Sequence, residues 1–488
     1  MAKKLAGIEP AAVWNCFEQI TEVPRPSKHE EKIVAFLINW AKEHNFDVKR
    51  DAIGNVRIHK PATPGMEDRK AVIIQGHSDM VCEKNTGVEI DFMTQGIDPY
   101  IDGDWVKAHG TTLGADDGIA LAMGMAILES KDIPHPEIEL LATMDEETSL
   151  TGATSLDTNL LTGDILINID SEVDGVFTIG CAGGVNTVGH IPYEKAEFPT
   201  NHTAYAVEIN GLMGGHSGIQ INEGRACAAK IMTRLVFNLM DKFNVKLTSF
   251  DSGSKHNAIP RDAKVVLAVA DSKIAEFEAY MKEFDGILKN EWGRTEKDLN
   301  FFFNKIEAPN RVMSDEMQWK LIRAFYSIPH GVLRMSPDVE GLVQSSGNFA
   351  ITETREDEVY VLTNQRSSVE SEKENISNQA RAALELAGAK VTPEEGYPAW
   401  QPNIDSSILK EACEIYERLF NSKPKIEIIH AGLECGLVGE KYPHMDMLSF
   451  GPQLQDVHTP SERCQISSVQ KNYKLLQEIL LNIPKKDK

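Results

Sequence analysis

The chain has 488 residues, of which 50 are Lys or Arg and 73 are Asp or Glu, so its formal net charge is −23. Hydrophobic residues make up 42% and charged residues 25%, a composition typical of globular proteins and not of disordered or fibrous ones. At about 150 residues per domain the length predicts two or three domains, and the acidic balance argues against nucleic acid or an anionic membrane surface as a partner.

The cysteines and the apolar segments predict a cytoplasmic protein. Seven cysteines are scattered along the chain without a CxxC pair, which argues against a disulfide framework and indicates a reducing compartment. The N-terminal segment has two lysines but no apolar stretch behind them, and no run approaches 18 consecutive apolar residues. We therefore expect neither a signal peptide nor a membrane span.

The first third of the chain predicts alternating helices and strands. Apolar residues recur at helical spacing within 28–44, and Ser27 with Glu30 predicts a capping box at the start of this helix. This alternation is typical of an α/β sheet with parallel pairings. Strands are expected at 54–58, 71–74, 138–144 and 165–169, and a second helix at 119–128.

After about residue 185 the pattern becomes that of an antiparallel α+β layer, and the α/β pattern resumes beyond a Pro- and Gly-rich stretch at 392–402. We therefore expect one discontinuous α/β domain, formed by 1–186 and 401–488, with an inserted α+β lid domain over 187–400. Its fold class is a mixed, largely parallel sheet flanked by helices. Strands are expected at 203–209, 264–270, 299–303, 359–362, 425–429 and 447–450, and helices at 223–242, 314–326, 370–386, 405–420 and 466–482.

Acidic and histidine side chains follow the expected strands of the α/β part. Ligands in open α/β sheets bind beyond the carboxyl ends of the strands, so these side chains are expected to converge. Crowded carboxylates repel one another, and a divalent metal ion is the simplest way to neutralise them. Each motif alone has an ordinary explanation, such as a helix N-cap, but their joint occurrence favours a metal site. The residues are His77, Asp79, Asp116, Asp117, Glu146, Glu147, Asp170 and His458.

The motifs around these residues resemble the aminoacylase/carboxypeptidase-G2 class of metallopeptidases, family M20, and within it the branch of carnosinase-like aminoacyl-histidine dipeptidases. Gly118 stands where many members of the wider class carry Lys, and Asp170 stands where carboxypeptidases carry Glu. Both departures fit the dipeptidase branch better than the carboxypeptidase and deacetylase branches. The matching segments are QGHSDMV (75–81), TLGADDGIA (112–120), ATMDEETSLTGA (142–153), INIDSE (167–172), GLMGGHSG (211–218), NAIPR (257–261) and HAGLECG (430–436).

The resemblance implies a pair of divalent metal ions bridged by Asp116. His77 and Asp170 would complete one site, and Glu147 and His458 would complete the other. Imidazole and carboxylate ligands suit Zn²⁺, with Co²⁺ or Mn²⁺ as alternatives, better than Ca²⁺.

The same resemblance assigns roles around the metals. Glu146 would act as general base and take a proton from a water molecule shared by the two ions, which would supply the attacking hydroxide. Asp79 would accept a hydrogen bond from the His77 ring and orient it. His216, in a glycine-rich turn, would stabilise the oxyanion of the tetrahedral intermediate, although an ordinary surface histidine is the alternative.

Three further residues are candidates for binding the substrate. Asn257 and Arg366 could hold a substrate carboxylate, because the guanidinium fork of arginine binds carboxylates through two hydrogen bonds. A surface salt bridge would explain Arg366 equally well. His430 follows an expected strand and could line the pocket.

The implied activity is hydrolysis of the peptide bond of unblocked dipeptides, including Xaa-His dipeptides such as carnosine. An N-acyl amino acid amidohydrolase with the same metals is the alternative, and the need for a free amino group would separate the two. A non-catalytic binding protein on this fold should have lost ligands or the base, and here all of them are present. The resemblance also implies a homodimer formed through the inserted domain.

Overall fold

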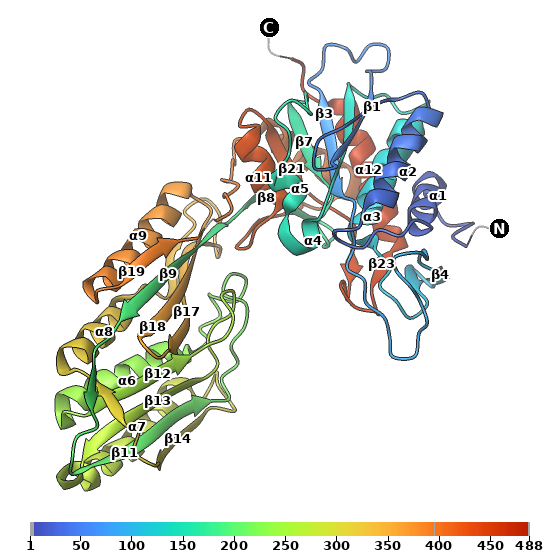
Figure 1. Ribbon diagram of the computed structural model, residues 1–488. Helices are drawn as coiled ribbons and strands as arrows, with labels where there is room; N and C mark the ends of the chain where they lie inside the picture. The colour runs from blue at the N-terminus through green and yellow to red at the C-terminus, as the bar shows by residue number, and fades with distance from the viewer. Residues whose placement is uncertain (1–3, 395, 487–488) are drawn as a thin grey trace. The chain divides into compact units, whose positions relative to one another are not determined.

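The computed structural model describes residues 4–394 and 396–486 and divides the chain into two compact units. Unit 1 takes its described residues from Met1–Gly180, Pro402–Ile428 and Leu433–Lys488, and unit 2 consists of those in Cys181–Gln401 and Ile429–Gly432. Figure 1 shows both units with their helices and strands.

Unit 1 is built on an eight-stranded mixed sheet in the order β1-β2-β6-β3-β7-β21-β8-β20. The four central strands, β6, β3, β7 and β21, pair in parallel, and β1–β2, β2–β6 and β21–β8 pair antiparallel. The sheet strands are β1 (Asp47–Arg50), β2 (Val56–Lys60), β3 (Val72–His77), β6 (Ile138–Thr143), β7 (Ile165–Asn168), β8 (Val176–Cys181), β20 (Lys425–Ile429) and β21 (Asp446–Ser449). A smaller antiparallel sheet contains β4 (Pro99–Asp102), β5 (Trp105–Ala108), β22 (Leu454–Gln455) and β23 (Arg463–Gln465).

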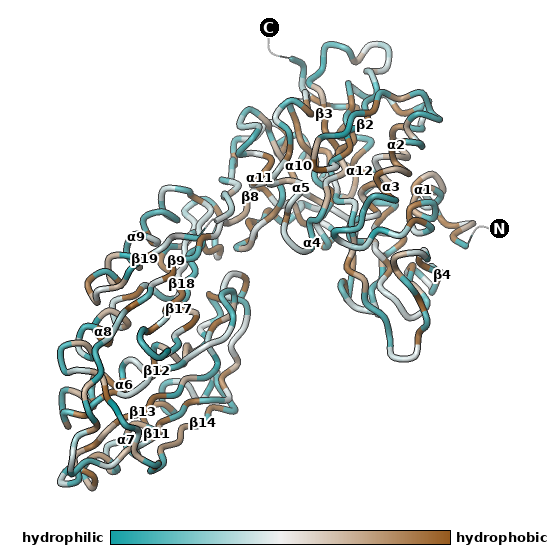
Figure 2. Tube along the Cα trace, in the orientation of Figure 1, coloured by the Kyte–Doolittle hydropathy of each residue, from teal (hydrophilic) through white to brown (hydrophobic). Residues whose placement is uncertain are grey.

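Helices flank this sheet and bury its central strands. Every residue of β3, β6 and β7 is buried, as expected for parallel strands covered on both faces. The helices are α1 (Ala11–Thr21), α2 (Glu31–Glu43), α3 (Ala115–Glu129), α4 (Glu146–Ser149), α5 (Thr151–Thr154), α10 (Ser407–Phe420), α11 (Glu434–Lys441) and α12 (Ile466–Asn482). Helix α3 packs against α1 and β3, and it is apolar along most of its length, as Figure 2 shows. The mixed α/β sheet expected from the sequence is confirmed.

The capping box expected at Ser27 and Glu30 is wrong. Helix α2 has Glu30 at its N-cap, without a side-chain hydrogen bond to the helix. The Glu30 carboxylate instead accepts a hydrogen bond from the backbone N–H of Asp145 at 2.8 Å, and Ser27 hydrogen-bonds to Asp79. Both side chains therefore serve the segments that follow β3 and β6 and not the start of the helix.

Unit 2 is an antiparallel α+β layer, which confirms the expected class of the insertion. Its nine-stranded sheet has the order β14-β11-β13-β12-β17-β18-β9-β19, with β16 paired to β17. Helices pack on the sheet and enclose the main hydrophobic core of the unit. The sheet strands are β9 (Gly183–Pro192), β11 (His202–Asn210), β12 (Lys246–Ser252), β13 (Ala263–Ala270), β14 (Asn300–Lys305), β16 (Gly331–Met335), β17 (Val343–Thr354), β18 (Glu358–Ser367) and β19 (Lys390–Pro393). The pair β10 (Lys195–Glu197) and β15 (Arg311–Met313) forms a separate ribbon, and the helices are α6 (Ala228–Phe243), η1 (Asp271–Lys273), α7 (Ile274–Trp292), α8 (Asp315–Ser327) and α9 (Glu370–Leu386).

No helix in the described part of the chain combines the length and the hydrophobicity that crossing a bilayer requires.

Candidate metal centre

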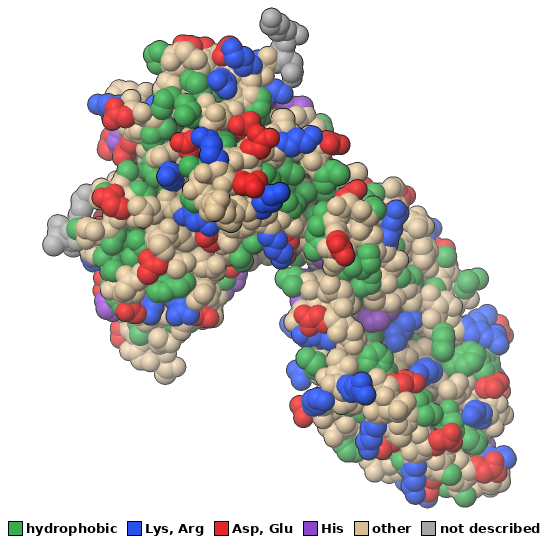
Figure 3. All heavy atoms as spheres, turned by 180° about the vertical axis from the view of Figure 1, so that it is seen from behind, with side chains coloured by type: hydrophobic (Ala, Val, Ile, Leu, Met, Phe, Trp, Pro, Cys, Tyr) green, Lys and Arg blue, Asp and Glu red, His purple; other side chains and the backbone are tan. Residues whose placement is uncertain are grey.

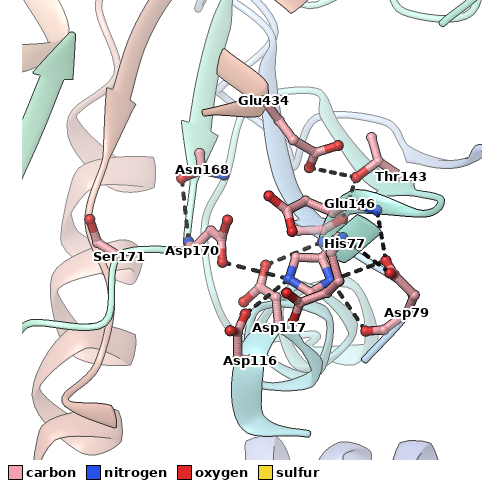
Figure 4. Close-up of polar contacts among 12 residues, drawn as sticks. His77, Asp79, Asp116, Asp117, Thr143, Glu146, Asn168, Asp170, Ser171 and Glu434 are labelled. Atoms are coloured by element: carbon pink, nitrogen blue, oxygen red, sulfur yellow. Dashed lines mark hydrogen bonds and ion pairs between the residues drawn. The ribbon is translucent and has the colours of Figure 1, made fainter. Parts of the chain in front are cut away.

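The carboxyl ends of three neighbouring parallel strands bring the candidate ligands of unit 1 together. Strand β3 ends at His77, the segment after β6 carries Glu146 and Glu147, and Asp170 follows β7 by two residues. Because β6, β3 and β7 are adjacent and parallel, these side chains emerge at one edge of the sheet. Figure 4 shows Asp116, Asp170 and Glu146 around the ring of His77.

Two groups of possible ligands share Asp116. His77 Nε2 lies 2.9 Å from Asp116 Oδ1 and 3.8 Å from Asp170 Oδ1. His458 Nε2 lies 3.1 Å from Asp116 Oδ2 and 2.9 Å from Glu147 Oε2. Within each group one ligand atom from every residue lies within 4.8 Å of the others, so each group could hold a metal ion. A third such group combines His77 with Glu146 and Glu147.

Asp79 connects the ring of His77 to the start of α4. His77 Nδ1 lies 3.3 Å from Asp79 Oδ1 and 3.2 Å from the Asp79 carbonyl oxygen. The same carboxylate accepts hydrogen bonds from the backbone N–H groups of Glu146 at 3.0 Å and Glu147 at 3.3 Å. Burial raises the pKa of Asp79, but the hydrogen bonds from His77 and Ser27 outweigh it and lower the pKa to about 2. Asp79 is therefore a charged acceptor that can fix the orientation of His77.

The other carboxylates show how strongly this site favours positive charge. Burial, with Glu434 and Glu147 nearby, raises the pKa of Glu146 to about 8 despite the attraction of His77. Burial and Asp117 raise the pKa of Asp170 well above its ordinary value. Carboxylates that bind protons this readily in a crowded, buried site are suited to bind a divalent cation in place of those protons. The donor set therefore fits two metal ions.

The backbone is unusual where two of these segments turn. His458 has φ 61° and Asp145, which precedes Glu146, has φ 49°. Residues other than glycine rarely adopt positive φ, and such positions cluster at functional sites. The turns place His458 and Glu146 at the edge of the sheet.

Unit 2 contains His216 in a tight glycine turn. Gly214 and Gly215 have φ 64° and 121°, and a Cβ at either would overlap the side chain of Arg261 or Arg225. These findings confirm the expected tight turn and close backbone approach. His216 Nδ1 accepts hydrogen bonds from the N–H groups of Gly218 and Ile219, both at 3.1 Å. In the neutral ring the proton therefore sits on Nε2, which is left to donate.

Arg366 and His430 are buried near His216, and the surface salt bridge considered for Arg366 is wrong. Arg366 is only 5% exposed, and it donates to Tyr397 Oη at 2.6 Å and to Asn364 Oδ1 at 3.2 Å. His430 Nε2 lies 2.7 Å from Ser346 Oγ. Burial, followed by the positive charge of Arg366 and the proximity of His216, lowers the pKa of His430 to about 3.

The third candidate for substrate binding, Asn257, is exposed in unit 2. Its carbonyl oxygen accepts a hydrogen bond from Ser217 N at 2.9 Å, beside the His216 turn. The four candidates of unit 2 therefore gather near one another through the His216 turn and the end of β18.

Three buried charged residues close to the candidate ligands, Arg25, Glu434 and Glu462, were not predicted from the sequence. Glu434 accepts hydrogen bonds from Gln75 Nε2 at 2.6 Å and Thr143 Oγ1 at 2.7 Å, and Arg25 and Glu462 bind the loop before α3. Glu434 lies within a motif that the sequence had singled out. Arg25 lies between two prolines with no recognisable pattern, so only its fold contacts identify it.

The chain belongs to peptidase family M20/M25/M40, because residues 73–482 match the sequence model of that family. It is 39% identical over 483 residues to the cytosol non-specific dipeptidase of Escherichia coli strain K12, a match that covers 99% of this chain and 100% of the relative. The crystal structure of aminoacylhistidine dipeptidase from Vibrio alginolyticus is 41% identical with a TM-score of 0.95, covering 99% of this chain and 98% of that one. Aminopeptidase PepT from Bacillus cereus, with 16% identity, a TM-score of 0.56 and coverage of 97% and 98%, shares the fold. The resemblance to family M20 drawn from the motifs is confirmed.

Proposed function

We propose that this chain is a cytoplasmic, metal-dependent dipeptidase that hydrolyses the peptide bond of unblocked dipeptides, including Xaa-His dipeptides such as β-alanyl-histidine. The observation that carries the proposal is its identity of 39% and 41%, over nearly its whole length, to two proteins described as dipeptidases. The shared-Asp116 geometry supports it, because two-metal sites of this kind suit hydrolysis of amide bonds.

Five side chains of unit 1 would hold the two ions. Asp116 would bridge them, with His77 and Asp170 on one ion and Glu147 and His458 on the other. Imidazole with carboxylate favours Zn²⁺, and Co²⁺ or Mn²⁺ would also fit. When bound, the ions would lower the pKa of a water molecule and polarise the scissile carbonyl.

Glu146 would move the proton. Its carboxylate lies beside His77 in the buried site (Figure 4), and burial among other carboxylates raises its pKa above the ordinary value of a carboxyl, a direction that favours proton uptake. Glu146 would accept a proton from the attacking water and deliver it to the nitrogen of the leaving amino acid, so that this amine leaves neutral. Asp79 would keep the His77 ring in one orientation throughout.

The roles of the residues in unit 2 stay predictions. His216 would donate its Nε2–H to the oxyanion of the tetrahedral intermediate. Arg366 and Asn257 would hold the carboxylate of the substrate, and His430 would line the pocket. The homodimer through the inserted domain is likewise a prediction.

The test is hydrolysis of Ala-His, β-Ala-His, Ala-Ala-Ala and N-acetyl-His by the metal-loaded protein. We expect cleavage of the two dipeptides only, with kcat reduced by about 10²–10⁴ in Glu146→Gln and unchanged metal content. Glu43→Gln, at the exposed end of α2, is the matched control and should retain full activity. Cleavage of N-acetyl-His alone would support an N-acyl amino acid amidohydrolase instead, and no cleavage of any compound would contradict the proposal.

A further inference from the structure

A buried carboxylate outside the proposed ligand set binds the Asp116 loop, residues 113–116, which leads into α3 and includes its first two residues. Glu462, which is 3% exposed, points both oxygens at the backbone of this loop. Oε2 accepts hydrogen bonds from Leu113 N at 2.8 Å and Gly114 N at 3.1 Å. Oε1 accepts from Ala115 N at 2.8 Å and Asp116 N at 3.4 Å. One side chain therefore satisfies four consecutive N–H groups at the start of α3, which otherwise lack helical partners.

A buried guanidinium binds the carbonyl side of the same loop. Arg25 is 1% exposed, and its Nη2 donates to the carbonyl oxygen of Gly114. Its Nη1 donates to the carbonyl oxygens of Ser78 at 3.2 Å and Asp79 at 2.6 Å, in the segment after β3. Gly114 has φ 69°, and a Cβ there would lie 2.6 Å from Arg25 Nη2 and 2.8 Å from Met80 Sδ. The loop thus fits Arg25 only with glycine at this position.

These contacts join the segments that carry three proposed ligands. Glu462 lies four residues after His458, so its hydrogen bonds tie the His458 segment to the loop of Asp116. Arg25 ties that loop to the segment of Asp79, whose carboxylate faces His77. Asp116 contacts both histidines, at 2.9 Å and 3.1 Å. A shift of the loop would therefore change both metal sites together.

We propose that Glu462 and Arg25 are positioning residues of the metal centre, which hold Asp116 in register with His458 and His77. The inference rests on the proposed two-metal function. Neither side chain would touch the substrate or the ions.

A role in stability alone accounts poorly for the burial of Arg25 and Glu462, because removing charged groups from water costs free energy. Removing two charges from water is costly, and a buried ion pair can be replaced by apolar residues with little loss of stability. Arg25 even leaves its Nε without a hydrogen-bond partner. Charged groups do, however, bind backbone N–H and C=O groups more strongly than neutral ones. They can therefore hold a loop firmly where the carboxylates of Asp116, Glu147 and Asp170 crowd together.

The test measures binding of Co²⁺ to the full-length protein after chelation, by calorimetry and by the visible absorption of bound Co²⁺. Glu462→Gln keeps the shape but leaves one acceptor oxygen for four N–H groups. We expect its affinity for Co²⁺ to fall about 10–100-fold, with an altered absorption spectrum.

Glu139→Gln is the matched control. Glu139 is also fully buried and accepts hydrogen bonds from Thr162 N at 3.0 Å and Gly163 N at 3.1 Å, but it lies near the amino end of β6, away from the site. This variant should lower the melting temperature and leave the Co²⁺ affinity and spectrum as in the wild type.

Wild-type Co²⁺ affinity and spectrum in Glu462→Gln would overturn the inference, as would an equal loss of affinity in Glu139→Gln. If Glu462→Gln does not fold, Arg25→Lys is measured instead, and we expect the same loss of Co²⁺ affinity. The ammonium group of lysine keeps the charge but lacks the two-pronged guanidinium that spans both segments. Unchanged Co²⁺ binding in that variant would also overturn the inference. A wild-type protein that binds no metal would instead refute the proposed function itself, so the two failures are distinguishable.

Discussion

Asp116 receives contacts from His77 and His458, which lie 39 and 342 residues away in the sequence. The sequence predicted Asp116 and His77 because these polar side chains lie next to an expected apolar helix or strand, and it predicted His458 only together with the other clusters and the resemblance. It could not predict Arg25 or Glu462, because their partners are backbone groups of distant loops. Almost every residue type has a backbone N–H and a C=O group, so the sequence does not show which segments bind Arg25 and Glu462 through them.

Asp79→Asn tests the orientation of His77. The amide keeps one acceptor oxygen, whereas the carboxylate serves His77 and two backbone N–H groups. We expect the affinity for Zn²⁺ to fall about 10–100-fold, measured by calorimetry against a competing chelator. Asp51→Asn is the control, since Asp51 is a buried turn carboxylate that accepts from Gly54 N and Asn55 N at 2.9 Å, outside the proposed ligand set. Equal affinity in Asp79→Asn and the wild type would show that Asp79 does not orient the ligand.

His430 should make the protein less stable in acid. Burial and the nearby Arg366 and His216 lower the pKa of the folded ring to about 3, against about 6.5 in an unfolded chain. The folded state therefore prefers the neutral ring, and the stability from this preference is complete above pH 6.5 and is lost as the pH falls toward 3. From pH 7.5 to 5.5 the loss should be about 1.4 kcal/mol.

His430→Gln removes this titration. Urea unfolding of chelated protein at pH 7.5 and 5.5 should show a smaller loss of stability in acid for this variant than for the wild type. His29→Gln, at an exposed position, should behave as the wild type does. The same acid sensitivity in all three proteins would contradict the assignment.

At the scale of single elements, strands extend beyond their apolar runs. The sequence predicted a strand at 71–74, but β3 continues through Gln75 and Gly76 to His77 because all three residues pair with β6, and Gln75 pairs with β7 as well. In unit 2, the strand expected at 359–362 is β18, which runs to Ser367 and includes Arg366. Hydrophobic patterns mark where a strand is buried among apolar side chains. They do not mark the polar residues at the end of a strand, which are buried by pairing with neighbouring strands where the candidate site lies.

The packing of α3 against β6 predicts opposite effects for the same substitution in two helices. Gly124 lies in α3, where a Cβ would overlap the side chain of Leu140, whereas Gly286 in α7 has open space at that position. We expect Gly124→Ala to lower the free energy of unfolding by about 1–3 kcal/mol through overpacking. Gly286→Ala should raise it by about 1 kcal/mol through helix propensity. Denaturant titrations measure both, and a stabilised Gly124→Ala would contradict the close packing.

At the scale of the whole molecule, the sequence predicted two kinds of sheet, and the two compact units contain them. Parallel buried strands read as continuous hydrophobic runs and half-exposed antiparallel strands as alternating ones, so the hydrophobic pattern separates the two architectures. The net charge says less about how charged side chains are distributed over the surface. Despite a net charge of −23, Figure 3 shows acidic and basic side chains intermixed on the visible face of both units.

Because the proposed ligands lie in unit 1, metal removal should act on the units unequally. A ligand present at 100 times its dissociation constant stabilises the state that binds it by about 2.7 kcal/mol. Calorimetric scans with and without a chelator should therefore shift the unfolding of unit 1 and leave the unfolding of unit 2 in place. Tryptophan variants confined to one unit would assign the transitions. An equal shift of both transitions would contradict a site built from unit 1 alone.

The most direct test of two metal sites that share Asp116 is the number of Zn²⁺ ions that chelator-treated protein binds tightly, measured by calorimetry for the wild type and Asp116→Ala. Both proposed sites use Asp116, which contacts His77 on one side and His458 on the other. We expect two tightly bound ions per wild-type chain and the loss of tight binding at both sites in Asp116→Ala, with loss of Ala-His hydrolysis. Two ions bound equally tightly by the wild type and by Asp116→Ala would contradict this expectation.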